Sequence, residues 1–254
     1  MEVKDRVAII PCAGQAKRMG QLDLPKSLIE IKGKPVLLHL LEKLSKFFDI
    51  FYIPINIKDK HHYLSHIPKN FLKKIVLIDS EPGTGDGQAV LDALYKIDAK
   101  EIMNDIMVCW GDTILSQDDL INLLVNLKFS EPLVIPVHLT KNPYVAYLEN
   151  DLGVPKRVAF QRRGEVYDEG KTDISLFLIK AEEIKNNLIQ LKQKNREMKD
   201  DVVSSLNSEL NFLDLVEHLY LVSNPAKFLD IDFNNDIYSF NTMEELGNIN
   251  KNLI

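Results

Sequence analysis

Apolar runs of strand length alternate with helix-patterned segments through the first 111 residues. The strand-like runs are RVAIIPCA, FYIPINI, KKIVLIDS and DIMVCWG, and the helix-like segments are PVLLHLLEKLSKF and QAVLDALYKI. This alternation is typical of β-α-β units in a parallel sheet. Strands that are apolar throughout fit a sheet covered on both faces. The pattern therefore predicts an α/β fold: a Rossmann-like three-layer domain with a mostly parallel central sheet, and a site beyond the carboxyl ends of its strands.

The pattern changes after residue 130. Four strand-like runs, EPLVIPVHL, YVAYLEND, KRVAFQRR and TDISLFLIK, follow one another with turn signals between them. We expect antiparallel additions to the sheet, then helices at 181–197 and 208–222, two short strands, and a last helix from Met243. Because no repeat, low-complexity tract or linker interrupts the chain, we expect one domain, 1–254, with halves 1–130 and 131–254.

Composition excludes several classes of protein. The chain has 254 residues, 45% of them hydrophobic, which is enough for a sizeable core. Its net charge is -6 and its cations are spread out, so we expect no nucleic-acid partner. No apolar stretch approaches the roughly 20 residues that span a bilayer, and charges interrupt the start, MEVKDRVAII. We therefore expect a cytoplasmic protein without a membrane partner, and leave a homo-oligomer open.

The cysteines and a group of histidines carry no predicted chemistry. Cys12 and Cys109 lie in or beside apolar strand patterns without a second ligand at metal spacing, which indicates packing. His61, His62 and His66 share one helical face, a pattern that fits either a metal site or a solvated surface. Because no carboxylate or cysteine clusters with them, we interpret that face as solvated.

The loop PCAGQAKRMGQLDLPK follows the first predicted strand. It begins at Ala13, at the sheet edge where backbone N–H groups and cations commonly hold phosphates. Walker spacing fails, because after Gly14 the next glycine is at position 20 and Gln21 follows it. The dinucleotide fingerprint fails as well, because Ala16 lies two residues after Gly14.

The same loop resembles that of the nucleotidyltransferase superfamily that activates sugar phosphates, including the MobA-like NTP transferases. In that family a small-residue loop is followed by Arg and then by Pro-Lys, and the matching residues here are Ala13, Gly14, Arg18, Met19, Pro25 and Lys26. The continuation SLIEIKGKPVLLHLLEKL is similar to the uridylyltransferase half of the bifunctional N-acetylglucosamine-1-phosphate enzymes. PGTGDGQAV, WGDT and FNTMEEL resemble the family's base-contacting segment, its metal-binding Gly-Asp and its late metal motif, in the same order.

The resemblance implies a reaction and a set of residues. A phosphate oxygen of an acceptor would attack the α-phosphorus of a nucleoside triphosphate and release pyrophosphate. Arg18 would contact the triphosphate, and Lys26 would bridge the α-phosphate and the acceptor phosphate. Mg²⁺ would be held by Asp112 and Asn241. The remaining contacts would be Ala13, Gly14, Gln15 and Ala16 with the phosphates, Gly83, Thr84 and Gly85 with the base, and Glu165 and Asp173 with the acceptor.

Simpler interpretations of these residues stay open. Asp112 or Thr113 fits a helix N-cap, and Asn-Thr at 241–242 fits a cap of the last helix. Asp230, Asp232 and Asp236 are substitutes for Asn241 as the second metal ligand. Trp110 is expected in the core. The family usually has Gly at the position of Ala16 and Thr or Ser at that of Lys17, so Ala16 fits if its φ is negative.

The base and the acceptor are less constrained. Uridylyl members carry Gln shortly before the Gly-Thr pair, where this chain has Ile78 and Asp79, so we favour CMP transfer from CTP. The acceptor is expected to be a sugar phosphate or a capsule-modification precursor such as phosphoglutamine, and we expect no fused acyltransferase because hexapeptide repeats are absent. The alternatives are uridylyl or guanylyl transfer, a glycosyltransferase that uses a nucleotide sugar, and a nucleotide sensor without catalysis.

Overall fold

The structure, a computed structural model, describes residues 6–16, 19–20, 23–97, 105–115, 118–200, 209–231, 237–240 and 242–252. Its strands are β1 (Val7–Ile9), β2 (Glu30–Ile31), β3 (Lys34–Pro35), β4 (Ile50–Ile55), β5 (Ile75–Asp79), β6 (Asp105–Cys109), β7 (Thr113–Leu115), β8 (Leu133–Lys141), β9 (Val145–Glu149), β10 (Pro155–Phe160), β11 (Glu169–Asp173), β12 (Leu176–Lys180), β13 (Lys227–Asp230) and β14 (Ile237–Ser239). Its helices are α1 (Val36–Leu44), α2 (Lys60–His66), α3 (Lys69–Leu72), α4 (Asp86–Lys96), α5 (Asp118–Asn126), α6 (Ala181–Asp200), α7 (Leu215–Leu221) and α8 (Met243–Asn252). Short 3₁₀ turns cover Lys26–Leu28, Ile57–Asp59, Gln161–Arg163 and Phe212–Asp214.

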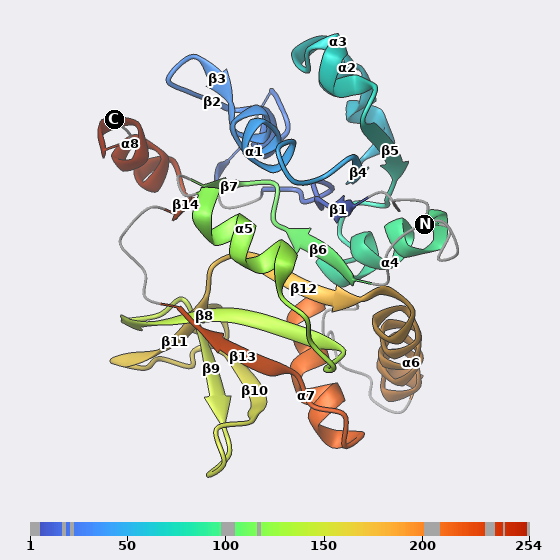
Figure 1. Ribbon diagram of the computed structural model, residues 1–254, viewed down its shortest axis with the longest axis vertical. Helices are drawn as coiled ribbons and strands as arrows, with labels where there is room; N and C mark the ends of the chain where they lie inside the picture. The colour runs from blue at the N-terminus through green and yellow to red at the C-terminus, as the bar shows by residue number, and fades with distance from the viewer. Residues whose placement is uncertain are drawn as a thin grey trace.

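One sheet joins both halves of the chain (Figure 1). Its strand order is β10-β9-β11-β8-β12-β6-β1-β4-β5, and β13 pairs with β8. β1 pairs in parallel with β4 and β6, and β4 pairs in parallel with β5. β12 joins β6 in antiparallel register, with Leu176 opposite Cys109, and β8 to β11 continue antiparallel. The predicted α/β architecture with antiparallel additions is confirmed.

Helices cover both faces of the parallel strands. Side chains alternate along β1, so that Val7 and Ile9 face the core shared with α4 and α6, while Ala8 and Ile10 face the core shared with α1. All four are nearly inaccessible, at 2% exposure or less. Burial on both sides explains why these strands are apolar throughout instead of alternating with polar residues.

A third, smaller core fixes the C-terminal helix. Its members are Met19, Ile31, Val36, Ile114, Phe240, Leu246 and Ile249. β14 pairs with β7, placing Ser239 opposite Thr113, and α8 follows at the edge of the molecule beside β2 and β3 (Figure 1). Thr242 and Glu245 form a reciprocal capping box at the start of α8, with N···O distances of 3.1 and 3.2 Å. The predicted cap interpretation therefore holds for Thr242.

Within the described part of the chain, no helix combines the length and apolar character needed to cross a membrane.

The packing of α1 predicts a large cost for truncating its buried face. Leu40 is fully buried, whereas Leu64 on α2 is 49% exposed. Leu40→Ala is expected to lower the free energy of unfolding by about 2–5 kcal/mol, because it leaves a cavity. Leu64→Ala should change it by about 0.5 kcal/mol or less. Urea denaturation of both variants checks this, and equal losses would contradict the assigned packing.

Candidate active site

A cavity of about 500 Å³ opens at the carboxyl edge of the parallel strands. Its lining brings together the loop after β1, the Lys26 turn, the 81–86 loop, the turn after β6 and a wall from the antiparallel half. We call it the edge cavity. Its lining residues are Pro11, Cys12, Ala13, Gly14, Gln15, Ala16, Lys26, Ser27, Glu81, Gly83, Gly85, Asp86, Ala89, Trp110, Gly111, Asp112, Tyr144, Val145, Phe160, Arg162, Thr172, Asp173, Ser175, Glu209, Asn211 and Leu213.

The loop after β1 takes its position from β4. The Cys12 N–H donates to the Pro54 carbonyl at 2.8 Å, and the chain then turns into the cavity. Ala16 adopts a φ of +48°, so the condition of a negative φ is not met. This left-handed conformation costs a non-glycine residue about 1–2 kcal/mol, which explains the family's glycine there. Arg18, the predicted triphosphate contact, lies outside the described residues.

Lys26 and Asp112 meet at the cavity floor. Lys26 follows Pro25 in a 3₁₀ turn, and Asp112 lies in the turn between β6 and β7. The Lys26 ammonium forms an ion pair with Asp112 Oδ2, and the two side chains are only 16% and 24% exposed. Because a strand and not a helix follows, the interpretation of Asp112 or Thr113 as a helix N-cap is wrong. Two residues 86 positions apart thus meet at the predicted reaction site.

The structure describes a neighbour of the second predicted metal ligand but not the ligand itself. Asn241 lies outside them, as do Asp232 and Asp236. The ring centroid of Phe240, the residue before Asn241, is 4.9 Å from Lys26 Nζ. Asp230 forms an ion pair with Lys171 at 3.1 Å and does not line the edge cavity. Among the side chains that the structure places, no cluster of three or more His, Cys, Asp or Glu residues could hold a metal.

The Gly-Thr loop is fastened by a segment from the far end of the chain. The Leu210 N–H donates to the Thr84 carbonyl and the Gly87 N–H to the Leu210 carbonyl, each at 2.8 Å. A Cβ atom at Gly85, whose φ is +100°, would lie 2.3 Å from the Leu210 carbonyl oxygen. Gly83 and Gly85 line the edge cavity, whereas the Thr84 hydroxyl donates to the Glu81 carbonyl at 2.6 Å. We call residues 209–214 the strap.

A second cavity, of about 930 Å³, lies at the Gly-Thr loop as well, and its lining includes Thr84, Gln88, Asp92 and Leu210. Glu81 lines both cavities. Ile78, at the position of the uridylyl glutamine, is 4% exposed, and Asp79 faces this second cavity.

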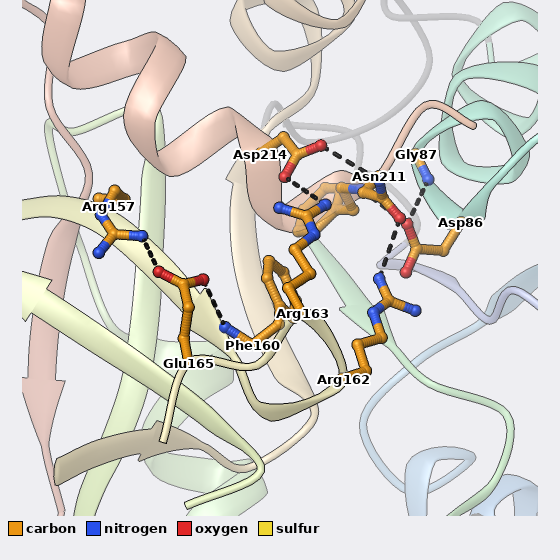
Figure 2. Close-up of polar contacts among 10 residues, drawn as sticks. Asp86, Gly87, Arg157, Phe160, Arg162, Arg163, Glu165, Asn211 and Asp214 are labelled. Atoms are coloured by element: carbon orange, nitrogen blue, oxygen red, sulfur yellow. Dashed lines mark hydrogen bonds and ion pairs between the residues drawn. The ribbon is translucent and has the colours of Figure 1, made fainter. Parts of the chain in front are cut away.

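Of the two predicted acceptor residues, only Asp173 lines the edge cavity. Asp173 lines the edge cavity, where Tyr147 Oη donates to its Oδ2 at 2.9 Å and the Ser175 N–H to its Oδ1 at 2.8 Å. Desolvation by burial raises the pKa of this carboxyl. Glu165 instead pairs with Arg157 and accepts from the Phe160 N–H at 3.2 Å (Figure 2). Glu165 thus closes a turn and is not among the residues that line the edge cavity.

Arg162 is a cation of the cavity wall that the sequence interpretation missed. Its guanidinium donates to Asn211 Oδ1 at 3.3 Å and lies 5.0 Å from the Phe160 ring centroid. Asn211 in turn donates to Asp214 at 3.1 Å, and Arg163 pairs with the same carboxylate (Figure 2). The only sequence signal is the pair of arginines that ends the strand-like run KRVAFQRR, and no sequence motif gives them a role.

The cysteines, histidines and Trp110 behave as packing or surface residues. Cys109 is buried, and Cys12 is half-buried at the cavity floor, where desolvation raises the pKa of its thiol to about 12. The thiol is therefore protonated at neutral pH and is a poor nucleophile. The three histidines lie on the partly exposed face of α2. Trp110 packs against Phe177 and Phe212, while also lining the cavity.

The parallel sheet, the small-residue loop at its carboxyl edge and the Lys26–Asp112 pair are the features of a nucleotide-binding transferase fold. The chain belongs to the family of MobA-like NTP transferase domains, whose model matches residues 8–165. Over 140 residues, 54% of this chain, it is 34% identical to the bifunctional protein GlmU of Methanocaldococcus jannaschii. Over 107 residues, 42% of this chain, it is 30% identical to the 2-C-methyl-D-erythritol 4-phosphate cytidylyltransferase of Vibrio atlanticus.

Solved structures share the whole fold. HddC from Yersinia pseudotuberculosis superposes with a TM-score of 0.70 at 17% identity, covering 98% of this chain and 100% of that one. A second structure of HddC is complexed with GMP-PN. The sequence matches to the curated relatives are shorter, spanning 30% of the length of the archaeal GlmU and 45% of that of the Vibrio enzyme.

Position 85 needs glycine for two separable reasons: its φ is positive, and the strap leaves no space for a Cβ atom. Gly85 and Gly153 both have positive φ, but only Gly85 has a backbone in the way of a Cβ atom. Gly153→Ala is expected to cost about 1 kcal/mol from backbone strain alone. Gly85→Ala should cost roughly 2–5 kcal/mol, because overpacking adds to the same strain. Equal losses in the free energy of unfolding for Gly85→Ala and Gly153→Ala, measured in urea, would contradict the close contact between the strap and the Gly-Thr loop.

Proposed function

We propose that the protein transfers a nucleoside monophosphate from a nucleoside triphosphate to a small phosphorylated acceptor and releases pyrophosphate. The observation that carries this proposal is the meeting of Lys26 and Asp112 at the floor of the edge cavity, beside the loop after β1. Within one cytoplasmic domain, 1–254, the half 1–130 would hold the nucleotide. The half 131–254 would supply the acceptor wall and the second metal ligand.

The proposed transfer reaction needs positive charge at the phosphates more than it needs a general base. An acceptor phosphate oxygen forms a bond to the α-phosphorus while the bond from that phosphorus to the β-phosphate oxygen breaks, and pyrophosphate carries away the electron pair. A phosphomonoester, with a second pKa of about 6, is already an anion at pH 7. The barrier therefore comes from bringing anions together, and Lys26 reduces it by placing an ammonium between the two phosphates.

A divalent metal fits the Asp112 carboxylate, which lines the edge cavity beside Lys26. Family members generally use a divalent metal ion, and Mg²⁺ takes one or two protein oxygens together with phosphates and water. Asp112 would be such a ligand and Asn241 the second. When bound, Mg²⁺ supplies positive charge to the phosphates. Asp112 would hold the metal, and Lys26, its ion-pair partner, would face the phosphates.

For the nucleotide we favour CTP. Where uridylyl members carry glutamine, this chain has Ile78, which is buried and apolar, and Asp79, a carboxylate in the lining of the second cavity, so the side-chain amide is absent. The Vibrio relative is named as a cytidylyltransferase, which agrees with this preference. The GMP-PN complex of HddC supports guanylyl transfer as the alternative, and the archaeal GlmU supports uridylyl transfer.

For the acceptor we propose a sugar phosphate or a capsule-modification precursor such as phosphoglutamine. Arg162 would contact its anionic group, and Asp173, which faces the same cavity, would accept from its hydroxyl or amino groups. Both side chains are held by described partners, Asn211 for Arg162 and Tyr147 for Asp173.

A pyrophosphate-release assay tests the reaction. The protein with Mg²⁺ is incubated with each of the four common NTPs and a panel of phosphorylated sugars, amino acids and alcohols. We expect release with one NTP, CTP, and one acceptor class. Lys26→Ala should lower kcat by about 10²-fold or more. Release that needs no acceptor, or that is unchanged in Lys26→Ala, would contradict the proposed mechanism.

The variants Arg162→Ala and Arg157→Ala test the proposed acceptor contact, with Arg157→Ala as the control. Arg162→Ala is expected to raise the acceptor KM about 10- to 100-fold, because it removes a charge-assisted contact of about 1.5–3 kcal/mol. The NTP KM should stay within about twofold. Arg157→Ala removes only the ion pair with Glu165, outside the cavity, and should leave both constants unchanged. Steady-state kinetics decide, and equal effects of the two variants would remove Arg162 from the acceptor site.

A further inference from the structure

A buried polar group lies beneath the Lys26–Asp112 pair. Its members are Tyr63 on α2, Ser27 in the Lys26 turn and Cys12 in the loop after β1. Tyr63 is fully buried and Ser27 is 4% exposed, in a layer that is otherwise apolar. Phenylalanine would fill the same space without a polar atom, so a tyrosine here needs a reason beyond packing.

The Tyr63 hydroxyl connects two segments of the site. Its oxygen lies 2.9 Å from Ser27 Oγ and 3.4 Å from the Cys12 carbonyl oxygen. A carbonyl can only accept, so Tyr63 donates to Cys12 and the Ser27 hydroxyl donates to Tyr63. Ser27 directly follows Lys26 in a single 3₁₀ turn. Movement of Ser27 would therefore move Lys26.

Cys12 extends the connection to Asp112. A Cβ atom at Gly111 would lie 2.3 Å from Cys12 Sγ and 3.1 Å from the Pro11 carbonyl oxygen. The Gly111 N–H also donates to Pro11 at 3.4 Å. The turn that carries Asp112 thus rests directly on the loop that Tyr63 holds from the other side.

We propose that Tyr63 is a positioning residue, which holds the Lys26 turn and the loop after β1 at the separation that the transfer reaction needs. The inference rests on the proposed function, because it assigns Lys26 its role in that reaction. Ser27 lines the edge cavity, whereas Tyr63 does not. Its effect is expected in kcat, through the placement of Lys26, and not in the KM for the nucleotide.

Three variants and a matched control test the proposal. Tyr63→Phe removes both hydrogen bonds of the Tyr63 hydroxyl, and Ser27→Ala removes only the one with Ser27. Either variant breaks the connection between the two segments, and the double variant has no further connection to break. Ile67→Val is the control, because Ile67 lies at the end of the same helix, in the same core and 4% exposed, without a polar contact to the site. Each protein is examined by thermal denaturation, hydrogen exchange of peptides covering 10–16 and 25–30, and steady-state kinetics with the NTP and acceptor that the wild type uses.

We expect faster exchange in both peptides for Tyr63→Phe and unchanged exchange for Ile67→Val at a similar loss of Tm. kcat should fall about five- to tenfold in each single variant and no further in the double variant, because both break one connection. Unchanged exchange in Tyr63→Phe overturns the proposal whatever the activity. So does an unchanged kcat, or additive losses in the double variant. A wild type that releases no pyrophosphate contradicts the proposed function instead, and the exchange data then still decide whether Tyr63 holds the two segments.

Discussion

The parallel pairing of β1 between β4 and β6 is the constraint on which the site depends. β1 has only three residues, all nearly inaccessible, and its register places the loop after it beside the turn after β6. Parallel strands present their carboxyl ends at one edge. Lys26 and Asp112 can therefore meet although 86 positions separate them in the sequence. Covering helices on both faces protect this pairing from water, so the apolar character of the strands and the position of the site have a common cause.

The antiparallel half turns this edge into an enclosed cavity. β12 continues the sheet from β6. Beyond it, β11 carries Asp173 and the 3₁₀ turn after β10 carries Arg162, and both line the edge cavity together with the loop after β1. The strap then crosses from this half to the Gly-Thr loop, with the Phe212 N–H donating to Asp86 at 2.7 Å. The edge cavity thus has two walls, which come from different halves of the chain.

Periodicity and motifs predicted most of the strands and helices and much of the cavity lining, because both depend on local sequence. The helix predicted at 208–222 is wrong at its start: α7 begins at Leu215, because Leu210 in the strap pairs instead with the Gly-Thr loop. The run DIMVCWG predicts a buried strand, and the loop from Ala13 to Ala16 lies where a phosphate loop is expected. Contacts between distant segments were not predictable. Glu165 was assigned to the acceptor because nothing in the sequence shows that Arg157 pairs with it. Arg162 was missed for the opposite reason, since its direction depends on Asn211, nearly fifty residues away. The positive φ of Ala16 likewise follows from loop closure and not from residue type.

The strap has a consequence for anyone who redesigns the protein. The Gly-Thr loop and residues 209–214 fit one another atom against atom, with no space for a side chain at Gly85 or Gly87. The same segment orients Arg162 through Asn211 (Figure 2). A loop transplanted from a homologue to change the base would therefore disturb the opposite wall unless its own strap came with it. Under the proposed function, the base-contacting loop, the strap and the acceptor wall are best exchanged together.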